Sequence, residues 1–177
     1  MWFALPLQIQ KMILNPQFRG YRIVEFGVFS SYGHPPLIEE ALKTGDLYLG
    51  VTHSKDQHAK LSKAYAEYSN ITILYMATPV IFSTQLPDES ADLVIFSNSF
   101  HEFIHEKSLL TEVHRILKHG ATLAIAEFSQ LQQERMIHFA NHDVVSKYTR
   151  TVIPLEPSLG VSVELYQKNN FRFAPIQ

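Results

Sequence analysis

The sequence predicts one α/β domain, in which a doubly wound and mostly parallel sheet carries helices on both faces. Three observations support this fold class. The 177 residues suit a single domain, and a hydrophobic fraction of 46% is enough for a sizeable core. Short apolar runs, typical of strands buried on both faces, alternate with amphipathic helical patterns. Such alternation indicates βαβ units with right-handed crossovers, which place a ligand at the carboxyl ends of the strands.

Residues 1–19 are predicted to form an amphipathic N-terminal helix, and residues 20–177 the domain itself. Pro6, Gln10 and Lys11 interrupt the apolar residues of this segment well short of the length of a membrane span. The segment also lacks the basic start and the unbroken apolar run of a signal peptide. We expect the helix to cover the core, and a lid or a dimer contact is the alternative.

Five apolar runs are predicted to be the strands of the sheet. They lie at residues 21–25 (YRIVE), 47–51 (LYLGV), 71–75 (ITILY), 91–96 (ADLVIF) and 122–126 (TLAIA). Most of them are nearly continuous rather than alternating, which is expected of a parallel sheet covered on both faces.

Three helices are predicted between these strands. The first covers residues 35–43 and opens with prolines, which a first helical turn tolerates. The second begins at Ser54, with Gln57 three residues later in a capping-box arrangement. The third carries an apolar stripe over residues 109–117 and ends at Gly120, a favourable glycine for a helix C-terminus.

The pattern is weaker after Phe128. Residues 130–147 and 157–169 are predicted to be helical, although Gly160 is unfavourable in the second of these helices. Residues 171–173 are predicted to be a last strand. The chain stops soon afterwards, so the sequence predicts a short C-terminal end.

Composition narrows the classes of partner. The formal net charge is −2 and the basic residues are scattered, so neither nucleic acid nor a membrane surface is expected as a partner. The absence of cysteine excludes a disulfide framework, a thiolate nucleophile and a cysteine zinc site. It also fits a reducing compartment, and we expect a cytoplasmic protein.

The segment at residues 86–128 carries the most specific pattern in the chain. It reads LPDESADLVIFSNSFHEF and, five residues later, LLTEVHRILKHGATLAIAEF. This order of loop, strand, helix and strand resembles the second half of a class I S-adenosylmethionine-dependent methyltransferase of the type 11-like group. The matching residues are Asp92, Val94, Glu112, Arg115, Leu117, Lys118, Gly120, Leu123 and Phe128. His119 replaces the usual proline of that pattern, and Ala121 replaces its second glycine.

The resemblance extends more weakly over residues 21–173 and implies a Rossmann-like fold. The late segment ELYQKNNFRF is similar to a helix and strand of that family, with Asn170 where glycine is common. The sequence does not decide whether the final antiparallel strand usual in the family is present.

The first strand of that family leads into an acidic residue and a Gly-x-Gly-x-Gly turn at the cofactor. Here Glu25 and Gly27 match, whereas Phe29 and Ser31 stand at the later glycine positions. Glycine is needed there because the backbone approaches the cofactor closely and adopts a positive φ. Phe29 is expected to fill part of the space that the methionine portion of the cofactor occupies.

Two further acids of the family are absent. The acid that binds the ribose hydroxyls after the second strand is replaced by Thr52, and the acid that contacts adenine after the third is replaced by Thr78. Each lost charge-assisted hydrogen bond is worth about 1.5–3 kcal/mol, so the two losses weaken binding by about two to four powers of ten. The resemblance assigns the cofactor site to Glu25, Phe26, Gly27, Val28, Thr52, His53, Thr78, Pro79 and Asn98.

Residues 98–103 are expected to line the mouth of the pocket. His101 is then a candidate substrate contact or proton acceptor, with a solvated surface histidine as the alternative. We assign no catalytic residue beyond this candidate.

A remote alternative is a zinc hydrolase, because His101-Glu102-x-x-His105 spells the motif HExxH. That motif requires a helix, but here it follows directly on a buried strand. Ser108 and Thr111 also stand where the extended motif has glycine and histidine. We therefore assign no metal site.

Two functions remain in view. The first is S-adenosylmethionine-dependent methyl transfer to a small molecule, which follows from the resemblance. The second is a non-catalytic relative that has lost the cofactor site, as Phe29, Thr52 and Thr78 suggest. This second protein is expected to bind a protein partner or to form a homodimer, through the N-terminal helix or an uncovered sheet edge.

Overall fold

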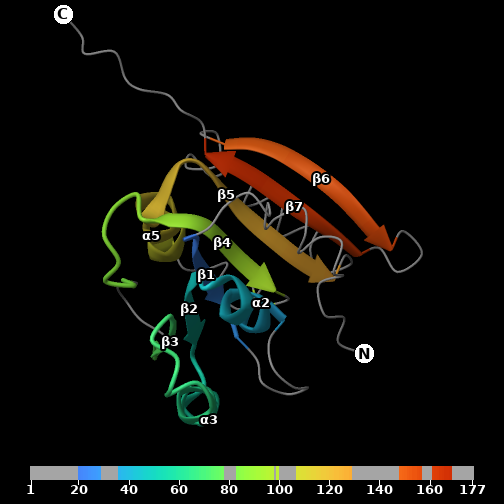
Figure 1. Ribbon diagram of the computed structural model, residues 1–177. Coiled ribbons are helices and arrows are strands. Elements are labelled where there is room, and N and C mark those ends of the chain that lie inside the picture. Colours follow the sequence, from blue (N-terminus) through green and yellow to red (C-terminus); the bar gives the residue numbers. More distant parts are fainter. Residues whose placement is uncertain are drawn as a thin grey trace, which may run out of the picture.

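A computed structural model describes residues 20–28, 36–77, 83–97, 99, 107–128, 148–156 and 161–168. Within these ranges seven strands form one sheet, in the order β3-β2-β1-β4-β5-β7-β6 (Figure 1). The strands are β1 (Arg22–Phe26), β2 (Leu47–Thr52), β3 (Ile71–Tyr75), β4 (Ala91–Ser97), β5 (Leu117–Phe128), β6 (Tyr148–Glu156) and β7 (Val161–Lys168). The described helices are α2 (Pro36–Thr44), α3 (Lys55–Ala64) and α5 (Lys107–Ile116).

The first five strands are parallel, as the sequence predicts, and the five predicted runs fall in them apart from Tyr21, which precedes β1. β1 lies at the centre, hydrogen-bonded to β2 on one side and to β4 on the other. The chain builds outward from β1 through β2 to β3, then crosses back to β4 and β5. The point where the strand order reverses therefore lies between β1 and β4, which is where α/β sheets bind their ligands.

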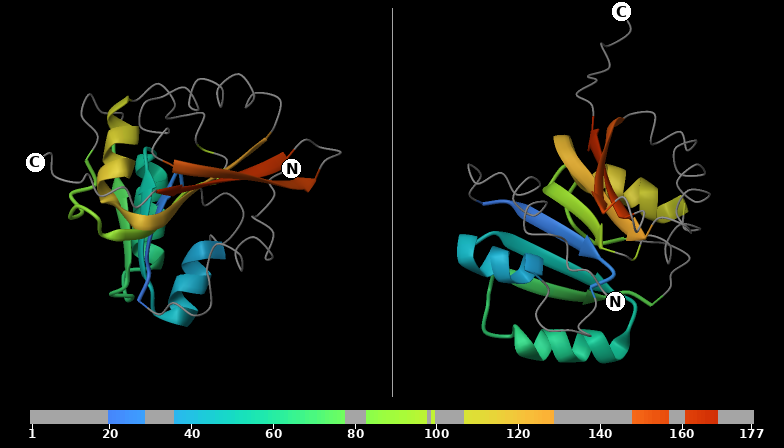
Figure 2. Two further views of the ribbon diagram at one scale, coloured as in Figure 1. Left: turned by 90° about the horizontal axis from the view of Figure 1, so that it is seen from above. Right: turned by 90° about the vertical axis from the view of Figure 1, so that its right-hand side faces the viewer.

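Two apolar clusters cover the two faces of the sheet. On one face, α2 and α3 pack their apolar side chains on β1 and β2; on the other, the apolar stripe of α5 packs on the same strands and on β4 and β5. The view from above in Figure 2 shows α2 and α5 on opposite sides of the sheet. The predicted doubly wound fold with helices on both faces is confirmed.

The C-terminal part differs from the prediction. Residues 161–168 form β7, antiparallel to both β5 and β6, and not part of the helix predicted over residues 157–169. In this segment Val161, Val163 and Leu165 alternate with polar residues, and this period of two with β-branched residues favours a strand. An antiparallel strand therefore does follow the parallel part, and β6 beside it was not predicted.

The third helix ends earlier than predicted. α5 stops at Ile116, and Leu117 already pairs with Ala91 at the start of β5. Gly120 has a φ of 77° and lies at an irregularity inside β5, where the register with β4 shifts. The glycine is needed for its positive φ, but in a strand bulge and not at a helix C-terminus.

The second helix begins as predicted, since the Ser54 hydroxyl accepts a hydrogen bond from the Gln57 amide at 3.3 Å. The predicted helices at residues 1–19 and 130–147 and the strand at 171–173 lie outside the described residues. None of the helices in the described ranges has the length and apolarity needed to cross a membrane.

Candidate functional site

The candidate site lies at the carboxyl ends of β1, β2 and β4, where the strand order reverses. Six of the residues assigned from the sequence are described there, at the ends of β1 and β2. They are Glu25, Phe26, Gly27, Val28, Thr52 and His53. Thr78, Pro79, Asn98 and His101 lie outside the described residues.

Gly27 turns the chain away from the end of β1. Its φ of 76° is in the left-handed region, which glycine adopts without the steric cost of a Cβ. The amides of Gly27 and Val28 both donate to the Val51 carbonyl of β2, at 2.8 Å and 3.2 Å. This part of the turn is therefore held against the neighbouring strand, and Val28 is buried.

Ser99 ties the end of β4 to the end of β1. Its hydroxyl is buried and donates to the Phe26 carbonyl at 2.6 Å. The Phe26 and Phe96 rings stack beneath this contact with their centroids 4.9 Å apart. Ser99 belongs to residues 98–103, which were expected to line the pocket mouth, but its contact with Phe26 was not predicted, because no motif marks a contact between residues so far apart in the chain.

Glu25 is the buried acid of the site and is 6% exposed. The Tyr48 hydroxyl, on β2, donates to its Oε2 at 2.5 Å. Burial, reinforced by the charge and the hydrogen bond of Glu25, raises the pKa of Tyr48 well above its ordinary value. Tyr48 therefore remains a protonated donor at neutral pH.

Thr52 ends β2 and is 1% exposed. Its hydroxyl oxygen accepts a hydrogen bond from the Ser54 amide at 3.2 Å, in the turn that leads into α3. His53, between them, is half-buried. The end of β2 thus offers a ligand a hydroxyl group but no carboxylate.

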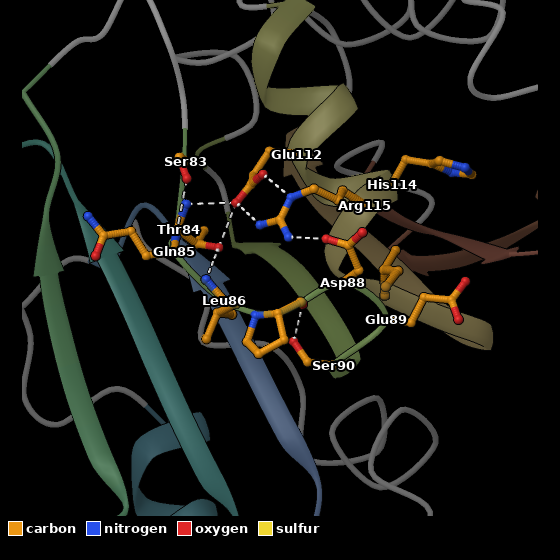
Figure 3. Close-up of polar contacts among 12 residues, drawn as sticks. Ser83, Thr84, Gln85, Leu86, Asp88, Glu89, Ser90, Glu112, His114 and Arg115 are labelled. Atoms are coloured by element: carbon orange, nitrogen blue, oxygen red, sulfur yellow. Dashed lines mark hydrogen bonds and ion pairs between the residues drawn. The ribbon is translucent and has the colours of Figure 1, made fainter.

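A second polar cluster involves the motif residues Glu112 and Arg115 of α5 (Figure 3). Glu112 is 5% exposed and accepts hydrogen bonds from the Thr84 amide and hydroxyl, both at 2.7 Å. Arg115 donates to Glu112 and, at 2.5 Å, to Asp88. These contacts fasten the loop at residues 83–90 to α5 at the amino end of β4, away from the candidate site. This part of the motif is therefore structural.

No cluster of three or more His, Asp or Glu side chains arranged to hold a metal ion occurs in the described part of the chain. The motif of His101, Glu102 and His105 lies outside that part.

Comparison with known proteins gives the family. A family model described as a methyltransferase domain matches residues 32–125, which is more than half of the 177 residues. No curated protein matches the sequence.

Solved structures show the same fold. A SAM-dependent methyltransferase from Aquifex aeolicus matches with a TM-score of 0.69 and 15% identity, over 93% of this chain and 89% of that one. The complex of the Haloferax volcanii Trm112 methyltransferase activator with a methyltransferase matches with a TM-score of 0.68 and 15% identity, over 92% of this chain and 89% of that one. The [4+2]-cyclase SpnF matches with a TM-score of 0.67 and 12% identity, over 92% of this chain and 80% of that one. At such low identity the likeness establishes the fold and not the reaction.

Proposed function

Since this chain belongs to the methyltransferase domain family, we propose that it binds S-adenosylmethionine and transfers its methyl group to a small molecule. The proposal rests on the glycine turn at the point between β1 and β4 where the strand order of the sheet reverses. Gly27, with a φ of 76°, directly follows the strand that ends in the buried Glu25 and Phe26. A turn of this kind allows backbone to approach a cofactor closely, and Glu25 supplies a negative charge beside it.

The described residues fit the amino acid part of the cofactor better than its ribose. Glu25 offers a carboxylate to the ammonium group, and the Gly27–Val28 turn offers a close backbone surface. Thr52 offers the ribose only a hydroxyl that already accepts a hydrogen bond from Ser54. We therefore expect an affinity for S-adenosylhomocysteine in the micromolar range, weaker than that of a site with a ribose acid by about tenfold or more.

The other assigned residues complete the proposed site. We also propose that His53 contacts the ribose, that Thr78 and Pro79 contact the adenine, and that Asn98 lines the mouth where the acceptor enters. The bound cofactor supplies an electrophilic methyl group on a sulfonium. The protein acts mainly by holding the acceptor in line with that group, which needs no essential acid or base. His101 is proposed to contact the acceptor or to take its proton.

The binding proposal is tested by isothermal titration with S-adenosylhomocysteine, comparing Gly27→Ala with Gly45→Ala. Gly45 has the same φ of 76°, lies between α2 and β2, and has no atom within 4 Å of an added Cβ. Both variants therefore carry similar backbone strain, of about 1 kcal/mol. We expect Gly27→Ala to lose binding and Gly45→Ala to keep it. If the wild-type protein gives no heat at millimolar ligand, the proposal is wrong.

A second candidate function is favoured by the buried Thr52 at the end of β2. A methyltransferase-like protein without its ribose acid can serve as a binding or scaffolding protein, for which S-adenosylmethionine is no ligand. The structural relative solved with the Trm112 activator supports a protein partner, and the relative named as a cyclase shows that this fold also serves other reactions.

In this alternative the segment 1–19, proposed as a helix preceding the domain at 20–177, is a contact with a partner or a second copy. Size-exclusion chromatography coupled to light scattering, with and without residues 1–19, tests that contact.

A further inference from the structure

We propose that Tyr48 is a positioning residue of the cofactor site, whose phenol holds the Glu25 carboxylate in place to receive the ammonium group of the ligand. This inference rests on the cofactor binding proposed above. It adds a residue to which the resemblance assigns no role, and it restricts that role to one part of the ligand.

The geometry of β1 and β2 brings the two side chains together. Glu25 and Tyr48 lie on the same face of the sheet but are not opposite each other, since Glu25 pairs with Gly50 and Tyr48 pairs with Ile23. Because Gly50 has no side chain, the Tyr48 ring can lie across it toward the carboxyl edge. A Cβ at residue 50 would be 2.9 Å from Cε1 of that ring, closer than side chains tolerate. The glycine thus provides the space through which the Tyr48 hydroxyl reaches Glu25.

The environment keeps Tyr48 in the protonated state that this role requires. Tyr48 is 2% exposed and Glu25 is 6% exposed, so water screens their interaction little. Tyr48 stays protonated, because burial and Glu25 both raise its pKa. A hydrogen bond donated to a carboxylate favours its ionised form and fixes its orientation. Tyr48 therefore offsets part of the cost of burying a charge on Glu25.

Only one part of the ligand carries a positive charge that the Glu25 carboxylate can attract. Among the last two residues of β1, β2, β3 and β4, Glu25 is the one acid. S-adenosylhomocysteine has a single cationic group, the ammonium of its amino acid part. 5′-Methylthioadenosine has the same nucleoside and sulfur but lacks that part. The Tyr48–Glu25 pair should therefore contribute to binding of the first ligand and not of the second.

The test measures the dissociation constants of both ligands for the wild-type protein, Tyr48→Phe and Tyr166→Phe. Tyr166 is a matched control, since it is also fully buried but lies in β7, in the cluster on the other face of the sheet. We expect Tyr48→Phe to weaken S-adenosylhomocysteine binding by about tenfold and to change 5′-methylthioadenosine binding by less than about twofold. Tyr166→Phe should leave the ratio of the two constants unchanged.

The alternative outcomes are distinct. Equal weakening of both ligands by Tyr48→Phe would mean that Tyr48 only supports the fold, and no change in either would mean that it contributes nothing to the site. Both results would overturn the positioning role while leaving cofactor binding intact. A wild-type protein that binds neither ligand would instead overturn the proposed function, and with it this role. Thermal melting of the two variants checks that each remains folded.

Discussion

Thr52 is the residue whose replacement should change cofactor affinity most directly. An aspartate at this position can accept the Ser54 amide, as the threonine does, and present its second oxygen to a ribose hydroxyl. We expect Thr52→Asp to tighten S-adenosylhomocysteine binding by about tenfold or more. Because 5′-methylthioadenosine has the same ribose, its affinity should rise by the same factor, unlike the selective effect expected at Tyr48. Isothermal titration with both ligands measures this.

Thr52→Asn is the control for that change, since asparagine has a similar shape and no charge. Its effect should be clearly smaller than that of aspartate. If aspartate gives no gain while the protein remains folded, the ribose does not lie at the end of β2, and the assignment of the site from the resemblance is wrong there.

Sequence reasoning located single residues where a short pattern is informative. Glu25 and Gly27 are two residues apart in a strand and its turn, and the cap by Ser54 is formed within three residues. The contacts of Tyr48 and Ser99 were not predicted, because they join residues 23 and 73 positions apart in the chain. Such contacts depend on which strands are neighbours, and no local pattern reveals this.

At the scale of elements, Lys168 joins β7 to the C-terminal end of α5. This lysine is 5% exposed, and its ammonium donates to the carbonyls of His114 at 2.9 Å and Leu117 at 2.7 Å. A cation at this end satisfies carbonyls without intrahelical partners and is favoured by the helix dipole. We expect Lys168→Met, which keeps the apolar stem, to lower the free energy of unfolding by about 1–3 kcal/mol. Urea denaturation measures this loss.

Lys118→Met is the matched control for that experiment. The Lys118 ammonium lies 2.6 Å from Asp92, but its side chain is 45% exposed. Exposed ion pairs contribute little, so this variant should lose less than about 1 kcal/mol. Equal losses in the two variants would show that burial of Lys168 at the helix end has no special effect.

The elements themselves were predicted well where their periodicity was consistent. The five parallel strands are apolar over most of their length because helices cover both faces, and the stripe of α5 has a clear helical period. β7 was predicted as a helix, although the alternation at residues 161–165 favours a strand. The end of α5 was misplaced because Gly120 suits a helix C-terminus and a strand bulge equally, and only the pairing of Leu117 with Ala91 distinguishes them.

For the molecule as a whole, the two edges of the parallel sheet have different chemistry. At the amino edge charged side chains connect loops to strands and helices: Asp92 accepts the Arg22 amide and pairs with Lys118, and Asp46 accepts the amides of Gly20 and Tyr21. At the carboxyl edge, among the described residues, the Ser99 hydroxyl and the Tyr48–Glu25 pair make polar contacts close to the glycine turn. We infer that the charged contacts of the amino edge stabilise the fold.

This division predicts how global stability depends on pH. Burial alone raises the pKa of Glu112, but hydrogen bonds from Arg115 and Thr84 outweigh it, and the pKa lies below the ordinary value for glutamate. A group with a lowered pKa in the folded state contributes stability above its unfolded pKa, about 4.3, and loses it as pH falls through the folded value. Glu112 should therefore stabilise the protein fully above about pH 5, and progressively less below about pH 4.

The test compares the urea denaturation of the wild-type protein and Glu112→Gln between pH 7 and pH 3. At pH 7 the variant should be less stable by about 1–3 kcal/mol, since its amide nitrogen faces the donors of Thr84 or Arg115. The difference in free energy of unfolding between the two proteins should become smaller toward pH 3, where Glu112 in the wild-type protein becomes protonated and loses its charge. Asp88→Asn, at the 77% exposed end of the same network, should differ from the wild type by less than about 1 kcal/mol throughout. If the difference between the wild-type protein and Glu112→Gln stays constant with pH, Glu112 is not ionised in the folded protein, and other groups cause the loss of stability in acid.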